Sequence, residues 1–441
     1  MFRLASIMLL TLSLIFVAAC SGGGGSKNDA TQETNQPDKA ANETTNNSGQ
    51  ELLFVGWSGE QELAGPPIKS YMKAWSDAHA PDSITWMGWP WGQTLEQLLL
   101  RGQGNEQMDV AQVDIGWLKT LSDAGLLTDL STVFDQKWLT DNYSEAYLKM
   151  GQVDGKQVAL PWTVAATSLV KNPSILEASG VKQDPTTIEE FEAALKQIKA
   201  ANKDIVPYAF DTKDEEMSTD FQVWLKMFGS DVFDDNGNII INNEGGVKAV
   251  TWLKSLLDQG LVKMDIAKYD ARQLFVQGKT AYIDDSIIIK GNVSSAGVSA
   301  ADLPSRISPV KRPVVKAGDP QVSKLWGHML VIPTTAVAPK KSASFIQHLV
   351  GPESSLDYFT KVGQLPVVKE AIANEKVQSD PISKTWLELT EFSTPSDTER
   401  TNVKKVLDKI ITEEVQAAML GAKSPQKAMD DAASRIKEAM K

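Results

Sequence analysis

The sequence predicts an α/β fold divided into two domains, and two observations support that prediction. From Glu51 onward, short apolar runs alternate with stretches whose apolar residues recur every three or four positions. Strands that alternate with helices in this way are typical of layers in which helices cover a mostly parallel sheet. The body of the chain, from Glu51 to Lys441, is also longer than one ordinary domain.

Strands are predicted where short apolar runs are bounded by glycine, proline or polar residues. The expected strands are 51–55, 84–89, 109–113, 166–170, 281–284 and 328–332. Tight hairpins are expected around Asp154-Gly155 and Asn236-Gly237, because these dipeptides tolerate the positive φ angles of two-residue turns.

Helices are predicted where the apolar spacing changes to three or four residues. The pattern Thr94-Leu95-Glu96-Gln97 is typical of a capping box and predicts a helix that opens at Thr94 and stops at Gly102. Further helices are expected over 68–75, 116–124, 186–200, 221–228 and 244–259, and the chain after Ile372 is expected to be nearly all helical.

The first 19 residues predict a secretory signal peptide. Arg3 is the only charge, and the apolar run from Leu4 to Val17 is too short and too weakly flanked for a membrane span. Cys20 is the only cysteine of the chain, which leaves no disulfide and no cysteine metal site. The sequence Val17-Ala18-Ala19-Cys20 resembles a bacterial lipobox. This resemblance implies cleavage before Cys20 and a lipid on its sulfur.

The segment 20–50 is expected to be a flexible tether between this lipid and the body. Ser21 to Gln50 contains no aromatic and no large aliphatic residue, so it cannot bury enough apolar surface to fold. Thirty such residues span roughly 30 Å on average.

Charge and motif spacing exclude several functions. The 44 basic and 56 acidic residues give a formal net charge of −12 without a basic stripe, which argues against nucleic-acid binding. The phosphate-loop motif fails because Gln273 stands where a glycine is needed, and the nucleophile elbow fails at Glu60. The three histidines lack metal or triad spacing. We therefore expect neither a metal, a cofactor nor a catalytic centre.

Adjacent carboxyls also fail to predict catalysis. Asp284 and Asp285 are neighbours on a predicted strand, and neighbours on a strand point to opposite faces. The acidic segment from Asp231 to Gly237 lacks the spacing of a calcium loop and is interpreted as a hairpin turn.

The order of segments resembles one family, the extracellular solute-binding proteins of family 1, which are the carbohydrate receptors of ABC importers. The matching stretches run in family order across nearly the whole mature chain: GWSGEQELA, PWGQTLEQLLLRG, DVAQVDIGWLKTLSDAGLLTDLS, VDGKQVALPWTVAATSLVKNPSILEASGV, PTTIEEFEAALKQIK, VWLKMFGSDVFDDNGNIIINNEGGVKAV, VQGKTAYIDDS and GQLPVV.

The resemblance implies two α/β lobes that close over a ligand cleft. Three crossing segments would join them, near Val164 to Thr167, Ser308 to Pro313 and Leu365 to Val367. Lobe 1 would comprise 51–163 plus 312–364, and lobe 2 would comprise 164–311 plus 365–441. The implied partners are a carbohydrate, two permease subunits with an ATPase, and the membrane through the lipid on Cys20, and we expect a monomer.

The twelve tryptophans supply the candidate ligand contacts, because the C–H face of a sugar packs on an indole and its hydroxyls bond to carboxylates and N–H groups. Helical or strand spacing assigns Trp75, Trp252 and Trp86 to the core. Ligands of such sheets bind beyond the carboxyl ends of strands, where several of the candidates lie. With the contacts that the resemblance implies, the candidates are Trp57, Glu60, Trp91, Asp114, Trp117, Trp162, Asp211, Trp224, Asp285 and Trp326.

Two other functions stay open at this point. A secreted carbohydrate-active enzyme would need two carboxylates facing each other at a glycosidase spacing. The same fold could instead bind a polyamine, a polyol phosphate or a metal, which would require clustered carboxylates, arginines, or histidines and tyrosines respectively. The tryptophan-rich loops favour a neutral sugar and only slightly favour an oligosaccharide.

Overall fold

The computed structural model describes residues 49–390 and 392–441. The predicted signal peptide, Cys20 and nearly all of the predicted tether lie outside the described residues. Within the described ranges, no helix combines the length and apolarity needed to span a membrane.

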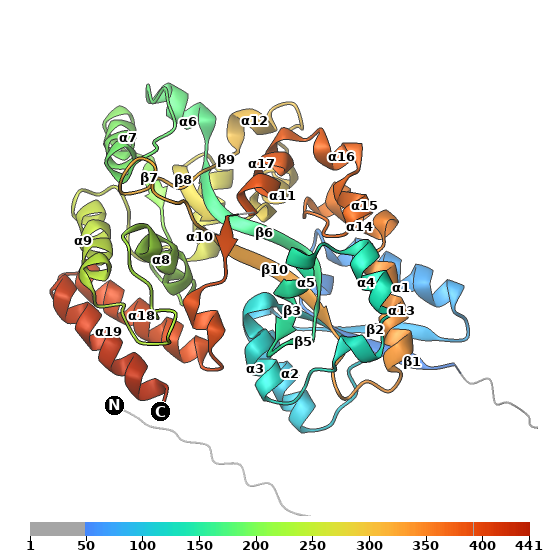
Figure 1. The fold of residues 1–441 in the computed structure, drawn as a ribbon. Helices are drawn as coiled ribbons and strands as arrows, with labels where there is room; N and C mark the ends of the chain where they lie inside the picture. The colour runs from blue at the N-terminus through green and yellow to red at the C-terminus, as the bar shows by residue number, and fades with distance from the viewer. Residues whose placement is uncertain (1–48, 391) are drawn as a thin grey trace, which may run out of the picture. The chain divides into compact units, whose positions relative to one another are not determined.

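One nine-stranded sheet organises this part of the chain (Figure 1). Its main order is β2-β1-β3-β10-β6-β8-β7, with β9 beside β6 and β11 beside β10, and β4 and β5 form a separate hairpin. The strands are β1 (Glu51–Gly56), β2 (Ser83–Gly88), β3 (Val110–Asp114), β4 (Gln152–Val153), β5 (Lys156–Gln157), β6 (Leu160–Lys171), β7 (Val206–Ala209), β8 (Thr280–Asp285), β9 (Ser308–Val310), β10 (Ser323–Val331) and β11 (Ser393–Thr394).

The predicted mostly parallel sheet is wrong, because the observed sheet is mixed. β2, β1 and β3 are parallel, as are β7 and β8, but β10 and β6 pair antiparallel with each other and with their outer neighbours β3 and β8. The sequence pattern missed this because β6 and β10 are buried along their length and carry no alternation that distinguishes their pairing.

The pairing directions make the carboxyl ends of the two halves of the sheet face each other. We call β2, β1 and β3 the first half and β8 and β7 the second half. β6 is antiparallel to β10, which is antiparallel to β3, so β6 and β3 run in the same direction. β8 runs against β6. The strands of the first half therefore end toward the second half, and those of the second half end toward the first.

Helices surround both halves of the sheet (Figure 1). Their bounds are α1 (Gly65–Ala78), α2 (Trp91–Gln103), α3 (Leu118–Asp123), α4 (Gln136–Asn142), α5 (Glu145–Met150), α6 (Pro173–Ala178), α7 (Ile188–Ala201), α8 (Glu216–Met227), α9 (Glu244–Asp258), α10 (Lys268–Val276), α11 (Ile288–Ser295), α12 (Leu303–Arg306), α13 (Pro339–Val350), α14 (Pro352–Val362), α15 (Lys369–Ile372), α16 (Glu375–Gln378), α17 (Pro381–Thr390), α18 (Lys404–Met419) and α19 (Pro425–Ala439). Short 3₁₀ helices are η1 (Ser58–Glu60), η2 (Ile115–Trp117), η3 (Leu130–Thr132) and η4 (Asp397–Arg400).

Most predicted elements are present, but several start earlier than predicted. Helix α2 begins at Trp91 rather than Thr94, because Pro90 precedes it and supplies an extended N-cap; Thr94 Oγ1 instead donates to the carbonyl of Pro90. α8 begins at Glu216 rather than Phe221, and β10 begins at Ser323 rather than His328. The apolar pattern misses the last two starts because Glu216 and Ser323 are polar.

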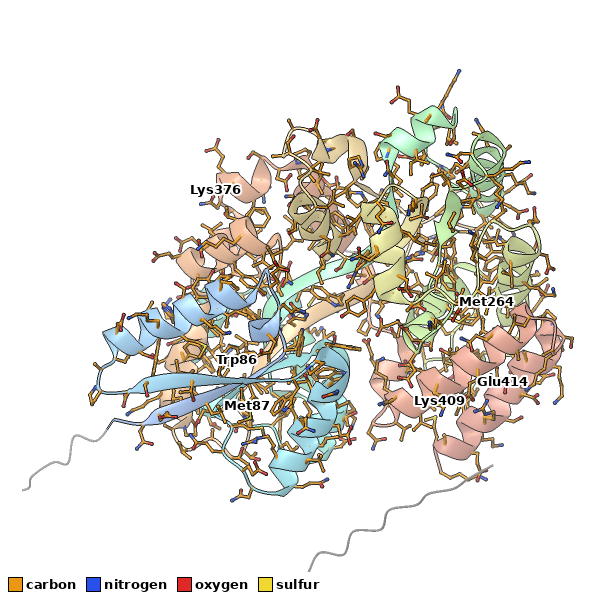
Figure 2. The ribbon with its side chains drawn as sticks, turned by 180° about the vertical axis from the view of Figure 1, so that it is seen from behind. Trp86, Met87, Met264, Lys376, Lys409 and Glu414 are labelled. Atoms are coloured by element: carbon orange, nitrogen blue, oxygen red, sulfur yellow. The ribbon has the colours of Figure 1, made fainter. Side chains whose placement is uncertain are left out.

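The strands are continuous hydrophobic runs in sequence because apolar cores cover both of their faces. In β1, Leu52 and Phe54 pack into one core and Val55 into another. In β7 and the residue after it, Tyr208 and Phe210 pack on one side and Ala209 on the other. Figure 2 shows side chains along both halves, from Trp86 and Met87 on β2 to Lys409 and Glu414 on α18. Strands buried on both faces show no polar alternation.

A buried ion pair lies in the core of the second half. Arg312 is 1% exposed, and its Nη1 lies 2.5 Å from Oδ1 of Asp284. Its guanidinium also stacks over the ring of Trp224, 4.7 Å from the centroid. The hydroxyl of Tyr208 donates to Asp284 as well. Asp285 points the other way and pairs with Arg272, which confirms that these adjacent carboxyls do not form one pair.

A second buried polar group, His328, lies where β10 meets β3. Gln112 Nε2 lies 3.1 Å from His328 Nδ1 and 2.7 Å from Ser58 Oγ, and Gln112 Oε1 accepts the backbone N–H of Ser58. Burial lowers the pKa of His328 to about 3. The ring is therefore neutral near pH 7, and since the amide donates to Nδ1, the proton of the ring is on Nε2.

We predict that Arg312→Met destabilises the protein by about 3–5 kcal/mol, because it leaves the carboxylate of Asp284 buried without its counter-ion. Urea unfolding measures the loss. Adding Asp284→Leu to this variant should recover much of it, because no isolated charge remains. Lys73→Met, which removes an exposed ion pair with Asp77, is the control and should leave the midpoint nearly unchanged. A single variant as stable as the wild type would contradict the prediction.

We predict that His328 makes the protein lose stability as the pH falls. Below the ordinary histidine pKa near 6.5, the unfolded chain binds a proton that the folded chain does not bind until the pH approaches about 3. Between pH 6.5 and pH 5 the loss should be about 1.6 kcal/mol. In His328→Gln this component should vanish, as measured by urea unfolding at both pH values. An equal pH dependence in the two proteins would refute the assignment.

Candidate ligand site

The candidate site lies where the carboxyl ends of the two halves face each other. Asp114 ends β3 and pairs through His328 with Thr163 of β6, whereas Asp285 ends β8 and pairs with Ser168 of the same strand. Five residue steps of β6 separate these positions, or roughly 16 Å along the strand. Polar side chains from both ends therefore share one region beside the middle of β6.

Aromatic rings form a continuous wall on the side of the first half. The Trp91 ring lies 5.5 Å from that of Trp117, which lies 5.3 Å from Trp57. Trp57 contacts His328 edge-to-face at 4.8 Å, and His328 contacts Trp326 at 4.4 Å. Four predicted ligand-binding tryptophans are thus brought into one contact chain through His328.

Exposure within this aromatic wall is uneven. Trp57 is 3% exposed and Trp117 is 7% exposed, whereas Trp91 and Trp326 are only partly buried. Trp91 begins α2 and Trp326 lies on β10, so the two accessible rings come from distant parts of the chain. Trp91 and Trp326 therefore have accessible ring surface, whereas Trp57 and Trp117 are nearly covered.

Charged residues form the side of the second half. Asp220 of α8 pairs with Lys268 of α10 at 2.8 Å, and Asp285 receives two hydrogen bonds from Arg272, one turn further along α10. Asp211, just after β7, is 1% exposed. Burial and the neighbouring carboxyls of Asp214 and Asp220 raise the pKa of Asp211 to about 9.

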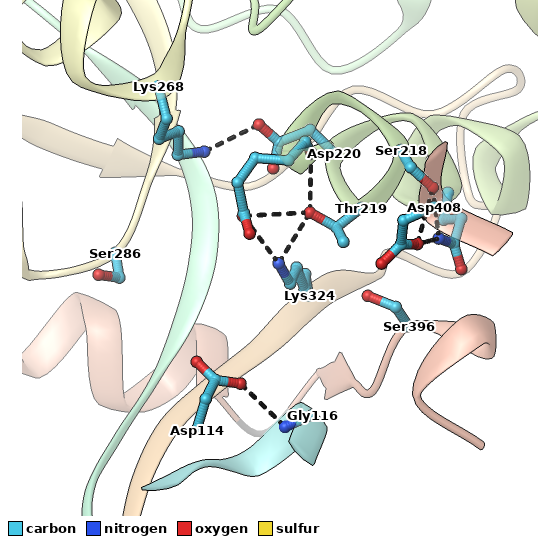
Figure 3. A network of polar contacts seen from close by, with 12 residues as sticks. Asp114, Gly116, Ser218, Thr219, Asp220, Lys268, Ser286, Lys324, Ser396 and Asp408 are labelled. Atoms are coloured by element: carbon cyan, nitrogen blue, oxygen red, sulfur yellow. Dashed lines mark hydrogen bonds and ion pairs between the residues drawn. The ribbon is translucent and has the colours of Figure 1, made fainter. Parts of the chain in front are cut away.

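Lys324 occupies the centre of the site at the start of β10 (Figure 3). Its Nζ donates to Thr219 Oγ1 at 2.9 Å and lies 3.5 Å from Oε2 of Glu216. Burial opposes ionisation of Glu216, but Lys324, Lys404 and Lys268 outweigh it and lower its pKa to about 2. The Glu216 carboxyl is therefore ionised near neutral pH.

A C-terminal segment completes the site from the second half. Glu399 of η4 and Lys404 of α18 lie against Gly116, and a Cβ added at Gly116 would stand 3.1 Å from both side chains. Thr120 Oγ1 lies 3.5 Å from the carbonyl oxygen of Asn402. These contacts join the loop after β3 to a segment almost 300 residues away in sequence.

Four of the predicted site residues lie apart from this arrangement or at its edge. Trp162 stacks on Tyr358 within the core of the first half, and Trp224 is fully buried in the core of the second half. Glu60 is exposed and accepts the indole N–H of Trp86 at 2.7 Å. Asp211 is buried just after β7 and accepts hydrogen bonds from the backbone N–H groups of Lys213 and Asp214.

Sequence reasoning missed most of the charged residues of the site: Glu216, Asp220, Lys268, Arg272, Lys324, Glu399 and Lys404. Two signals were available. Lys324 lies two residues before Trp326 on a strand and hence on the same face, and Lys268 and Arg272 lie one turn apart on a helix. No local signal marks Glu399 or Lys404, because only tertiary folding brings them to β3. Among the described residues, no three histidine, cysteine or acidic side chains are placed to hold a metal ion.

Comparison with known proteins identifies the family of this chain. The family described as bacterial extracellular solute-binding protein matches residues 71–385. A binding protein of Brucella abortus is 24% identical over 220 residues, and the match spans 49% of this chain and about half, 53%, of the relative's length. The arabinooligosaccharide-binding protein of Bacillus subtilis is 23% identical over 327 residues, 71% of this chain and 72% of its own.

A solved structure has the same fold. The GacH receptor of Streptomyces glaucescens, solved without ligand and with acarbose, aligns with a TM-score of 0.77 over 89% of this chain and 98% of its own, at 18% identity. This likeness shows the predicted two-lobe α/β fold. With the match over 71–385, it follows that the chain belongs to the bacterial extracellular solute-binding proteins.

Proposed function

We propose that the protein captures a carbohydrate, more specifically an oligosaccharide, between its two lobes and delivers it to an ABC importer. The observation that carries this proposal is the aromatic wall that ends in the accessible rings of Trp91 and Trp326, beside the carboxyl of Asp114. Indole faces next to hydrogen-bonding acceptors suit the apolar faces and hydroxyl rims of sugars. The names of the arabinooligosaccharide-binding relative and the acarbose-bound structure support the same ligand class.

The energetics of such a site are sufficient for receptor affinities. Covering one indole face contributes at most about 2–3 kcal/mol at roughly 25 cal/mol per Å². Two stacks on Trp91 and Trp326, with hydrogen bonds to carboxyls such as Asp114 and Asp285, could reach the approximately −8 kcal/mol of micromolar binding after the losses of association.

Lobe closure is the proposed mechanism. A ligand that contacts both lobes favours the closed form, because only that form offers all its contacts. We place the lobes at 51–163 plus 312–364 and 164–311 plus 365–441. The change of β6 from pairing with β10 at Thr167 to pairing with β8 at Ser168 supports the first crossing near Val164 to Thr167. The proposed crossings at Ser308 to Pro313 and Leu365 to Val367 complete the hinge.

The proposed setting is the outer face of the cell membrane. A lipid on Cys20 would anchor a monomeric receptor through the tether 20–50, and two permease subunits with an ATPase would receive the sugar. Binding rather than catalysis is proposed, because the family and the relatives are binding proteins.

A polyamine ligand is the second candidate, and one observation favours it. The region that sequence reasoning described as mostly tryptophan also gathers acidic side chains, Asp114, Glu216, Asp220 and Glu399, around the aromatic wall. Ammonium groups are attracted to both indole faces and carboxylates.

We predict that thermal melting of the protein with mono- and oligosaccharides identifies a stabilising ligand. A sugar at one hundred times its dissociation constant should add about 2.7 kcal/mol to the free energy of unfolding. The same sugars should stay intact, and a nitrophenyl glycoside should not be hydrolysed. Unchanged melting curves with every saccharide and a clear shift with spermidine would favour the polyamine reading and reject the carbohydrate reading.

We predict that Trp91→Ala and Trp326→Ala each weaken binding of that ligand about tenfold to a hundredfold, since each removes one stacking surface of up to about 2–3 kcal/mol. Titration calorimetry measures the affinity. Trp138→Ala removes another partly buried indole, which packs on Phe134 outside the site, and serves as the control that should keep full affinity. Equal losses in all three variants would argue against a role for the aromatic wall.

A further inference from the structure

The site contains more acidic groups than cations can neutralise, and the lysines at its centre are already engaged. Lys324 donates to Thr219 and lies 3.5 Å from Glu216. Lys404 lies 2.5 Å from Oδ2 of Asp408, one turn further along α18. Lys324 and Lys404 therefore each have a carboxylate of their own.

The other two cations of the site also form ion pairs with carboxylates. Lys268 pairs with Asp220 at 2.8 Å and Arg272 with Asp285 at 2.7 Å, which leaves neither cation for the facing side. Each of these cations is thus neutralised by one carboxylate, and neither supplies excess positive charge to the first half.

Asp114, Glu399 and Asp211 are left without an ion-pair partner among the described residues, and of these Asp114 and Glu399 come from opposite halves. Asp114 accepts a hydrogen bond from the backbone N–H of Gly116 at 2.9 Å, and Glu399 accepts one from Ser396 at 3.3 Å. Among the described residues, neither has a cation within ion-pair distance. Both are partly buried and lie against the same glycine, since Glu399 Oε1 is 3.1 Å from the Cβ position of Gly116.

The electrostatics of these two carboxyls agree with the geometry. Burial raises the pKa of Asp114, and burial raises the pKa of Glu399 to about 7, with a further contribution from Asp114 itself. Lys324 and Lys404 face both groups and lower both pKa values, but they do not offset the burial. Two carboxyls without a cation between them each favour the protonated form of the other.

An independent observation points to a ligand at the same place. The hydroxyl of Ser396, which precedes η4, is 4% exposed and has no hydrogen-bond partner among the described residues. In Figure 3 its oxygen points to the side on which Lys324 and Asp114 lie. Buried hydroxyls are normally bonded, so an unpaired one beside a binding site indicates a missing partner.

We propose that the bound saccharide carries a protonated amine, and that Asp114 and Glu399 hold this amine between the two halves of the sheet. This inference rests on the proposed function and adds the charge of the ligand to it. An ammonium group has three donors, which match the oxygens of Asp114, Glu399 and Ser396. The indole of Trp117, three residues after Asp114, adds an aromatic ring nearby. Aromatic rings attract cations. A hydroxyl would supply donors without charge and would leave these carboxyls without a counter-ion.

The decisive comparison uses matched sugars that differ only in charge. Titration calorimetry of the full chain at pH 6 should include a glucosamine oligomer, its N-acetylated counterpart, a malto-oligosaccharide of equal length and spermidine. The glucosamine oligomer should bind at least tenfold more tightly than the acetylated oligomer, and raising the salt concentration should weaken it selectively.

Variants connect this preference to the two carboxyls. Asp114→Asn and Glu399→Gln should each reduce the affinity for the glucosamine oligomer at least tenfold more than they reduce the affinity for neutral oligomers. Glu388→Gln, which neutralises an exposed carboxyl on α17, is the matched control and should change neither. Thermal melting of each variant without ligand verifies that it is folded.

The outcomes separate the two proposals. If neutral oligomers bind as tightly as the glucosamine oligomer, the proposal of a protonated amine is overturned and carbohydrate capture stays intact. The same holds if the affinity for neutral oligomers rises as the pH falls, because a proton then takes the place of the amine. Binding of spermidine without any saccharide would overturn carbohydrate capture. Preference for the amine that survives both carboxyl variants would overturn the assignment to Asp114 and Glu399.

Discussion

The shared strand β6 is the constraint on which the rest of the structure depends. Its first part is hydrogen-bonded to β10 and its last part to β8, so one continuous strand belongs to both halves of the sheet. Because β6 is parallel in direction to β3 and antiparallel to β8, the carboxyl ends of both halves must face each other. The meeting of these strand ends, where we propose the binding region, is a consequence of strand direction.

The two sides of the candidate site differ in chemistry because different side chains are buried at the strand ends of the two halves. The first half ends in indole rings that pack on one another and on His328, which is neutral because burial disfavours its charged form. The second half ends in ion pairs such as Asp220 with Lys268, which remain tolerable because each charge has a partner. An apolar wall thus faces a charged wall. This arrangement suits a ligand with one apolar face and a polar rim.

Core and site use the same residue types, and only packing separates them. Trp224 and Trp326 are both tryptophans of the central region, yet Trp224 is fully buried over Arg312 whereas Trp326 is partly exposed at the end of the aromatic wall. The same holds for Asp284, which neutralises Arg312 inside the core, and Asp285, which faces Arg272 at the site. Strand alternation explains the second pair, and no local pattern explains the first.

The sequence by itself determined the α/β class, most strands and helices, the opposite faces of Asp284 and Asp285, and the strand ends near which Trp57, Trp91 and Asp114 lie, because these depend on periodicity and turn residues within a few positions. Tertiary structure alone decided the mixed direction of the sheet and which tryptophans share a wall. It also brought Glu399 and Lys404 to Gly116. These features depend on contacts between segments hundreds of residues apart, for which hydrophobic spacing along the chain contains no information.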